Sequence, residues 1–176
     1  ASDVYKRQDK NKPEKQQRNQ TGSPILEEGD ILLNTTLAET NDWQQVDLPV
    51  VRTLRHFCIE TLSSYTEDNQ ACISEVDLLD DKGQPIDKTK WEVVYVSSEQ
   101  ADKNLGVAEN LFDGDISSFW HTDPATEPGQ PHRIIVDIKE IYKISALRFK
   151  VRKGAFLSGK VKEINVYGRP QFFLFH

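Results

Sequence analysis

The sequence predicts an all-β protein folded as a β-sandwich or jelly roll, and two observations carry this prediction. From about Gly29 onward, short runs rich in β-branched and aromatic residues alternate with turn residues, and no long helical stripe interrupts them. Within several runs apolar and polar residues alternate, as in Ile134, Val136 and Ile138. This period of two is typical of strands that bury one face. Many short strands at such spacing indicate two packed sheets.

We expect about eight or nine strands. In chain order the candidates are Ile31–Leu37, Trp43–Leu48, Arg55–Ser63, Ile73–Leu79, Trp91–Ser97, Arg133–Ile138, Ala146–Arg152, Val161–Tyr167 and Gln171–Phe175. The connectors DDKGQP, DPATEPGQP and RKGAFLSGK carry the Gly, Pro and Asp residues that turns require.

The N-terminal residues 1–28 are expected to form a disordered tail, and residues 29–176 a single domain. Residues 1–26 consist mainly of Lys, Gln, Asn and Asp, which bury too little apolar surface to fold. The opening ASDVYKRQ resembles a translated cloning adapter, so we leave it out of the fold prediction.

Charge indicates the kind of partner. The chain has 22 basic and 28 acidic residues, a net charge of −6, and the basic tail leaves the rest of the chain more acidic still. An acidic body repels a phosphate backbone, so we expect no nucleic-acid partner. It suits neutral ligands or cations. No apolar run is long enough for a membrane helix, and membrane binding is not expected.

The sequence offers little for catalysis. Asp113 and Asp115 are too close together in the chain to flank a scissile bond from opposite sides, as a hydrolase requires. None of the four histidines lies in an HExxH motif, and the chain has no GxSxG motif. We therefore expect the protein not to be an enzyme.

Two cysteines, Cys58 and Cys72, lie in strand-like segments. They are expected either to form one disulfide, in an oxidising compartment, or to act as two small buried hydrophobic residues. The chain has no CxxC motif, so a zinc site is not expected.

The segment Leu111–Thr122, LFDGDISSFWHT, is the strongest candidate for a site. Asp113 and Asp115 flank a glycine, and two serines follow, so several oxygen groups lie on one tight turn. Such an arrangement can wrap a hard cation such as Ca²⁺, although a plain Asp-Gly turn explains the same residues. Trp120 is placed to enter the core after the turn and to anchor it.

Several motifs occur in an order that resembles a known family. A strand ending in SS is followed by AENLFDGDISSFWHT, then PHRIIVDI, then a strand with an arginine, a loop with glycines, and VKEINVYG. Residues 90–168 thereby resemble the discoidin, or F5/8 type C, domain, most closely the family 32 carbohydrate-binding modules. The resemblance implies a galactose-binding-like jelly roll and a non-catalytic carbohydrate-binding module.

The resemblance also implies a setting for such a module. It would be ancillary to a glycoside hydrolase, with a catalytic domain in the same polypeptide, or part of a surface glycan-binding protein. The place would be extracellular, at the cell surface or periplasmic. The alternative is a protein- or membrane-binding discoidin-type domain with an adhesive or structural role.

The order of the two halves differs from the usual family order. Segments that resemble the second half, TTLAETNDWQQVDLP, RHFCIETLSS and ACISEVDLL, precede the first half in this chain. Either the domain is circularly permuted, with halves 29–86 and 90–176, or the chain joins the end of one tandem copy to the start of the next. We favour permutation, because the two halves add up to one full set of strands.

The resemblance implies a calcium site shared between the halves. Glu75 supplies a side-chain oxygen and Ser74 a carbonyl, and they meet the turn after Leu111. From that turn, Asp113 supplies a carboxylate, Ser118 a hydroxyl and a carbonyl, and Asn110 and Asp115 mainly carbonyls. The alternative for Glu75 is a solvated strand residue. The calcium would be structural.

The resemblance also implies a glycan site at one end of the sandwich. His121 and Arg152 match the family histidine and arginine that hydrogen-bond sugar hydroxyls, as in galactose or N-acetylgalactosamine. The alternatives are that His121 packs on Trp120 and that Arg152 forms a surface ion pair with Glu163.

Two departures from the family pattern affect sugar specificity. Pro124 stands where the family often has an aromatic residue, and Ser158 where it often has an asparagine. We include Ser158 in the ligand site, and Phe156 or Tyr65 as a replacement for the aromatic platform.

Overall fold

The computed structural model describes residues 22–66, 68–125, 129–151 and 159–176. These residues form seven antiparallel strands and three short 3-10 helices, which confirms the all-β prediction. The strands are β1 (Ile31–Thr36), β2 (Gln44–Thr61), β3 (Cys72–Asp80), β4 (Glu92–Val96), β5 (Trp120–His121), β6 (His132–Val151) and β7 (Glu163–Arg169). The 3-10 helices are η1 (Glu28–Asp30), η2 (Asp102–Asn104) and η3 (Ala108–Phe112). In the part of the chain described, no helix is long and apolar enough to cross a membrane.

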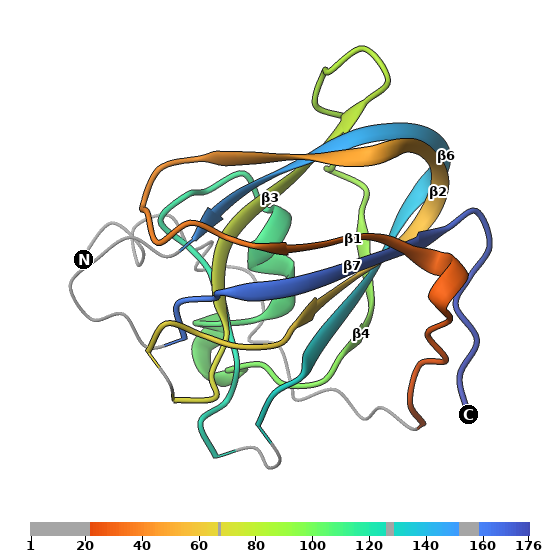
Figure 1. The fold of residues 1–176 in the computed structure, drawn as a ribbon. Helices are drawn as coiled ribbons and strands as arrows, with labels where there is room; N and C mark the ends of the chain where they lie inside the picture. The colour runs from red at the N-terminus through yellow and green to blue at the C-terminus, as the bar shows by residue number, and fades with distance from the viewer. Residues whose placement is uncertain (1–21, 67, 126–128, 152–158) are drawn as a thin grey trace.

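Two long, bent strands connect the layers of the fold. The strand order is β1-β7-β2-β6-β3-β5, and β4 pairs with the first half of β6. β2 and β6 have 18 and 20 residues, and Figure 1 shows them curving together. The first half of β6 therefore lies with β4, and its second half lies with β3, in the other layer. This arrangement is consistent with a β-sandwich.

The bends explain why the strand count is lower than predicted. The segments Trp43–Leu48 and Arg55–Ser63 merge into β2, and Arg133–Ile138 and Ala146–Arg152 merge into β6. The connecting residues 49–54 and 139–145 contain no glycine, and the strand continues through both bends. The register of β2 shifts at two places, and Lys139 in β6 adopts a positive φ of 74°. Such irregularities bend a strand and increase its twist.

Strands from the two halves of the chain alternate in space. β1, β2 and β3 belong to residues 29–86, and β4, β5, β6 and β7 to residues 90–176. Every ladder between the named strands joins one half to the other, except the β4–β6 ladder. Neither half can therefore complete a sheet without the other.

The core lies between the layers. Its largest fully buried side chains include Trp120, Phe57 and Phe149. Phe57 packs edge-on against Trp91, with ring centroids 5.5 Å apart. Trp120 donates a hydrogen bond from Nε1 to the carbonyl of Ser98 at 2.9 Å, so it anchors the end of the candidate turn as the sequence predicts.

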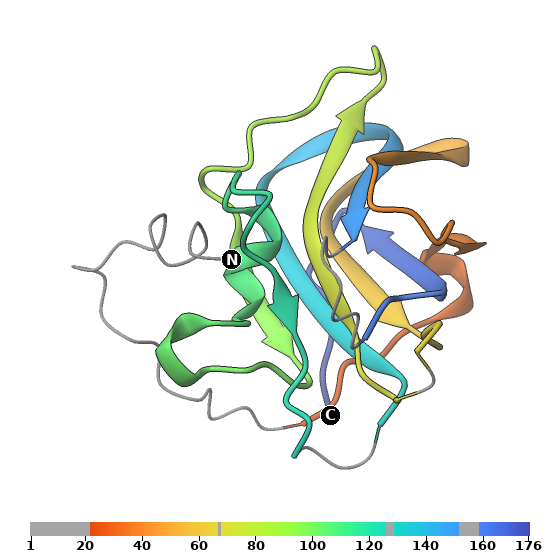
Figure 2. The same cartoon turned by 90° about the vertical axis from the view of Figure 1, so that its left-hand side faces the viewer.

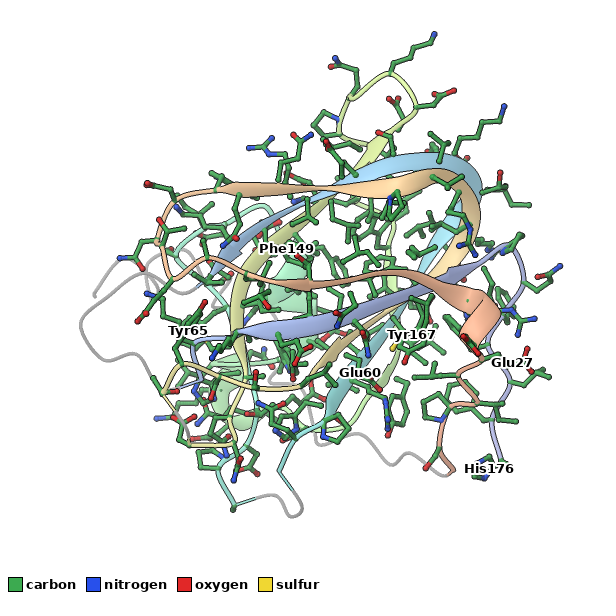
Figure 3. The ribbon with its side chains drawn as sticks, viewed as in Figure 1. Glu27, Glu60, Tyr65, Phe149, Tyr167 and His176 are labelled. Carbon is green, nitrogen blue, oxygen red and sulfur yellow. The ribbon has the colours of Figure 1, made fainter. Side chains whose placement is uncertain are left out.

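A second apolar cluster lies on the other face of the β2–β7 layer. It consists of Cys58, Ile135, Tyr167 and Phe173, with Leu26, Ile31 and Tyr95 packed against it. Polar side chains border the cluster, and Figure 3 shows Glu60 beside Tyr167, whose hydroxyl lies 3.1 Å from Glu60 Oε1.

The two ends of the described chain cover this second cluster. The Ile25 amide donates to the Leu174 carbonyl at 2.7 Å, and the Phe173 amide donates to His56 Nδ1 at 2.9 Å. The predicted strand Gln171–Phe175 is present only as an isolated bridge between Pro24 and Phe175. Residues 23–25, from the predicted tail, are thus part of this pairing, whereas residues 1–21 lie outside the described residues.

Both cysteines are buried, and neither is part of a disulfide. Cys58 lies in β2 and Cys72 in β3, and β6 separates these two strands. The disulfide alternative is therefore wrong, and the two thiols act as small hydrophobic side chains. Burial raises the pKa of Cys58 far above its usual range, which keeps it protonated.

Candidate functional site

The predicted metal ligands from the two halves of the chain meet at one place. Ser74 Oγ lies 2.6 Å from the carbonyl oxygen of Ile116 and 2.8 Å from that of Ser118. The Gly114 amide donates to Glu75 Oε2 at 3.1 Å. Figure 2 shows the segment with η2 and η3 on one side of β3. The structure thus brings Ser74 and Glu75 against the 113–118 turn, about 40 residues further along the chain.

Local backbone features shape both sides of this contact. The pairing of β3 with β6 shifts between Ile73 and Glu75, which places a bulge at Ser74. Bulges often re-aim side chains beside functional sites. In the turn, Gly114 has a φ of 78°, a conformation that other residues adopt only with strain. The glycine between the two aspartates is therefore a requirement of the turn.

The turn gathers oxygen atoms on its inner side. Ser118 Oγ lies 2.5 Å from Asp113 Oδ2 and 3.0 Å from the Asp115 carbonyl oxygen. A hydroxyl carries one hydrogen, so it cannot donate fully to both acceptors. The Asp115 side chain instead stays within the turn, because Oδ1 accepts from the Ser117 amide at 2.9 Å and from the Ser117 hydroxyl at 2.6 Å. The Asp115 carbonyl oxygen faces the Ser118 hydroxyl in this turn.

Glu75 is a buried carboxyl group with one satisfied oxygen. Its side chain is 1% exposed. Oε1 is buried and has no hydrogen-bond partner among the described residues. Burial raises the pKa of Glu75 to about 7, although Lys88 and the Gly114 amide favour the charged form. The alternative of a solvated strand residue is wrong.

Asp113 shares this environment. Burial raises the pKa of Asp113, while hydrogen bonds from Ser118 and from the Asp115 amide oppose the rise. Two buried carboxyl groups side by side are hard to ionise. A divalent cation bound between them would favour the charged form of both.

Lys88 was not expected at this site. Its Nζ contacts Glu75 Oε2 and lies 2.6 Å from Asp77 Oδ1. The turn sequence DDKG could have indicated its position, because a turn there returns the chain along β3. The Ile86 amide donates to the Leu78 carbonyl across that turn. The same register places Lys88 opposite Val76, between the side chains of Glu75 and Asp77.

The donors fit a hard cation with oxygen ligands. Among the described residues, no three side chains of His, Cys, Asp and Glu converge as a metal site. The cluster has two carboxyl groups, a hydroxyl and main-chain carbonyls, and Ca²⁺ accepts this mixture. Glu75 Oε1 is buried without a hydrogen-bond partner among the described residues, so a bound cation would satisfy it.

Asn110 braces the turn. Its side-chain nitrogen lies 3.1 Å from the Asn104 carbonyl and 3.0 Å from the Phe119 carbonyl. The side-chain nitrogen thus links the two ends of the segment that contains η3.

His121 is buried in the structure, at 3% exposure. Its Nδ1 lies 2.6 Å from the Thr122 carbonyl oxygen, so Nδ1 carries the proton and donates it there. The Phe119 ring meets the imidazole edge-on, with centroids 6.3 Å apart. His121 is thus buried against Phe119, whereas the alternative expected from the sequence was packing on Trp120.

Tyr65 lies at the same end of the fold. Its hydroxyl donates to the Leu37 carbonyl at 2.7 Å, and its amide donates to the Lys160 carbonyl at 2.7 Å. Cys72 forms bridges to both His121 and Lys160, which brings the two predicted ligand residues near one segment. The ring of Tyr65 is half-buried under Lys162, whose Nζ is 5.5 Å from the centroid.

The other predicted ligand residues, Arg152, Phe156 and Ser158, lie outside the described residues. The ends of their loop are placed. Val151 pairs with Ile73, and the Gly159 amide donates to Thr66 Oγ1 and Asp68 Oδ2, both at 3.1 Å. The loop therefore leaves and re-enters the fold at the end that holds His121 and Tyr65.

Comparison with known proteins supports the resemblance for one part of the chain. Residues 93–171 match the F5/8 type C domain. The matched segment holds the 113–118 turn, β6 and β7, whereas Ser74, Glu75 and Lys88 come before it.

A region of this chain is also similar to part of a sialidase from Micromonospora viridifaciens. The two are 33% identical over 84 residues, which is 47% of this chain and 13% of the sialidase. The chain thus spans only a small part of that relative.

Proposed function

We propose that the protein is a non-catalytic carbohydrate-binding module of the family 32 kind. The similarity to part of a protein named as a sialidase carries this proposal, because F5/8 type C domains serve as accessory binding modules. The ligand would be a glycan of the galactose or N-acetylgalactosamine type. An attached glycoside hydrolase domain and an extracellular, cell-surface or periplasmic location belong to the same proposal.

The end of the fold with Tyr65 and His121 is the proposed glycan site. In the resembling modules the sugar site lies on the loops at one end of the sandwich, and Val151 and Gly159, which flank residues 152–158, lie near that end. Arg152 supplies the directional donors, with Phe156, Ser158 and Tyr65 as further contacts. His121 supports the site through its hydrogen bond to Thr122.

Glycan binding tests the proposal directly. The chain is expected to bind galactose-type or N-acetylgalactosamine-type glycans on an array, and Arg152→Ala is expected to weaken that binding at least about tenfold, because one charged hydrogen bond is lost. Titration calorimetry with the best glycan measures the loss.

The matched control is Lys143→Ala, which removes one exposed cation from the bend of β6 and is expected to bind as the unchanged chain does. An array without any bound glycan, together with clear binding to liposomes, would reject the carbohydrate proposal in favour of a membrane-binding discoidin domain.

We also propose a structural calcium ion at the cluster of Glu75, Asp113 and Ser118, with main-chain oxygens from Ser74, Asn110, Asp115 and Ser118. The unpartnered buried Oε1 of Glu75 supports it. Bound there, the ion would tie β3 to the turn and so join the two halves of the chain.

Removal of calcium tests this site. A ligand of the native state stabilises it by mass action, about 2.7 kcal/mol at a hundredfold excess over Kd. We expect EDTA to lower the melting temperature by several degrees and added calcium to restore it. Glu75→Gln is expected to remove most of this response, whereas Glu92→Gln, at an exposed strand position, retains it. An unchanged melting temperature in EDTA contradicts the calcium proposal.

The order of the halves is best explained by circular permutation, and we propose it for residues 29–176. Strands from the two halves alternate in the sheet, and this supports permutation. The strands of both halves together form the sheet of one domain.

A further inference from the structure

A lysine side chain lies in contact with the proposed calcium cluster. Lys88 comes from the loop between β3 and β4, which folds back along β3 through the Leu79–Pro85 bridge. Its Nζ contacts Glu75 Oε2, lies 2.6 Å from Asp77 Oδ1 and donates to the Val76 carbonyl at 3.1 Å. The Lys88 side chain is 17% exposed, and that of Glu75 is 1% exposed. The ammonium group is therefore a largely buried cation next to a proposed metal ligand.

The two oxygens of Glu75 have different environments. Oε2 meets Lys88 and the Gly114 amide, whereas Oε1 has no hydrogen-bond partner among the described residues. Lys88 is also held by Asp77, so it does not depend on Glu75 alone. A calcium ion at Oε1 and the ammonium at Oε2 would then share one carboxylate.

We propose that Lys88 is a built-in counter-cation that weakens calcium binding at this cluster and keeps the turn in place when calcium is absent. This inference rests on the proposed calcium site. It concerns the strength of that site and the dependence of the fold on the ion.

Charge explains both effects. An ammonium group within a few ångströms of a divalent ion repels it, and burial makes the repulsion stronger than in water. Without the ion, Lys88 offsets the charge of Glu75, which would otherwise face Asp113 across the cluster. The native contacts between β3 and the turn can then persist.

The test compares three substitutions. Lys88→Met removes the charge and keeps a side chain of similar length, Lys88→Arg keeps the charge, and Lys90→Met removes an exposed cation from the same loop. Calcium affinity is measured by calorimetry at low ionic strength and alkaline pH, because burial raises the pKa of Glu75. Melting temperature is measured in EDTA and in calcium.

We expect Lys88→Met to bind calcium on the order of tenfold more tightly than the unchanged chain. It should also melt at a lower temperature in EDTA and recover in calcium. Lys88→Arg and Lys90→Met should behave as the unchanged chain. If Lys88→Met does not fold in EDTA, recovery in calcium supports the proposal, and failure to recover overturns it.

The outcomes separate the two proposals. Equal or weaker calcium affinity of Lys88→Met, with calcium still bound by the unchanged chain, overturns the role of Lys88 alone. Binding of calcium by Lys88→Met and not by the unchanged chain supports it. No calcium binding by either protein, up to millimolar concentration, overturns the calcium site and the role of Lys88 together.

Discussion

Separate halves of this chain are expected not to fold. If residues 22–89 and 90–176 are produced as two polypeptides, the first should lack fixed structure, because β1, β2 and β3 pair only with strands of the second. The second keeps only the β4–β6 ladder, and a two-stranded unit is marginal in water. Circular dichroism and denaturant unfolding of each fragment measure this.

Mixing the fragments provides the control. Together they should regain the β spectrum and a single cooperative transition, since all the cross-half ladders can form again. A second control cleaves the intact folded chain between residues 87 and 90, and the nicked protein should stay associated. Cooperative unfolding of either fragment alone would contradict the expectation and indicate two independent folding units.

The fold class could be predicted from the sequence, and the number of strands could not. Ile134, Val136 and Ile138 indicate a strand, and all three side chains are buried, but Ile135 and Asp137 on the opposite face are buried as well. The bend at Lys139 carries no sequence signal, because a lysine with positive φ is held there by its surroundings. The Asp137 carboxylate, which accepts from the Lys139 amide at 2.8 Å, is part of those surroundings.

The candidate site could be predicted in part. The resemblance places Glu75 with Asp113, and the structure brings them together, since Gly114, next to Asp113, bonds to Glu75. Residue types alone could not do this, because the contact depends on how β3 is ordered in the sheet. Lys88 was missed because a lysine between two turn segments is usually solvated. The burial of His121 was also beyond the sequence, because it depends on the backbone of Gly106, whose carbonyl accepts from the His121 amide and whose amide donates to the Gln100 carbonyl.

Trp120→Ala is expected to be the most destabilising single substitution considered. Trp120 has 0% exposure and is the largest of the fully buried side chains. Removal of a buried aromatic ring costs about 3–5 kcal/mol through lost burial and the cavity left behind. It also leaves the Ser98 carbonyl without its donor. Denaturant unfolding at equilibrium measures the loss, provided that the unfolding slope is unchanged.

Trp43→Ala is the matched control, because it removes the same side chain from a half-buried position where Arg148 lies 4.6 Å from the ring centroid. It should cost about 1 kcal/mol. Similar losses for the two variants would show that Trp120 does not anchor the core.

Trp120→Phe separates the two contributions of this residue. Phenylalanine fills most of the space but cannot donate to Ser98, so the expected cost is about 1–3 kcal/mol. Trp120 pairs with Ile73, directly before Ser74 and Glu75, and follows the 113–118 turn by two residues. A ring that shifts here moves both sides of the proposed calcium cluster. The calcium response of Trp120→Phe should therefore weaken together with its stability, whereas that of Trp43→Ala should not.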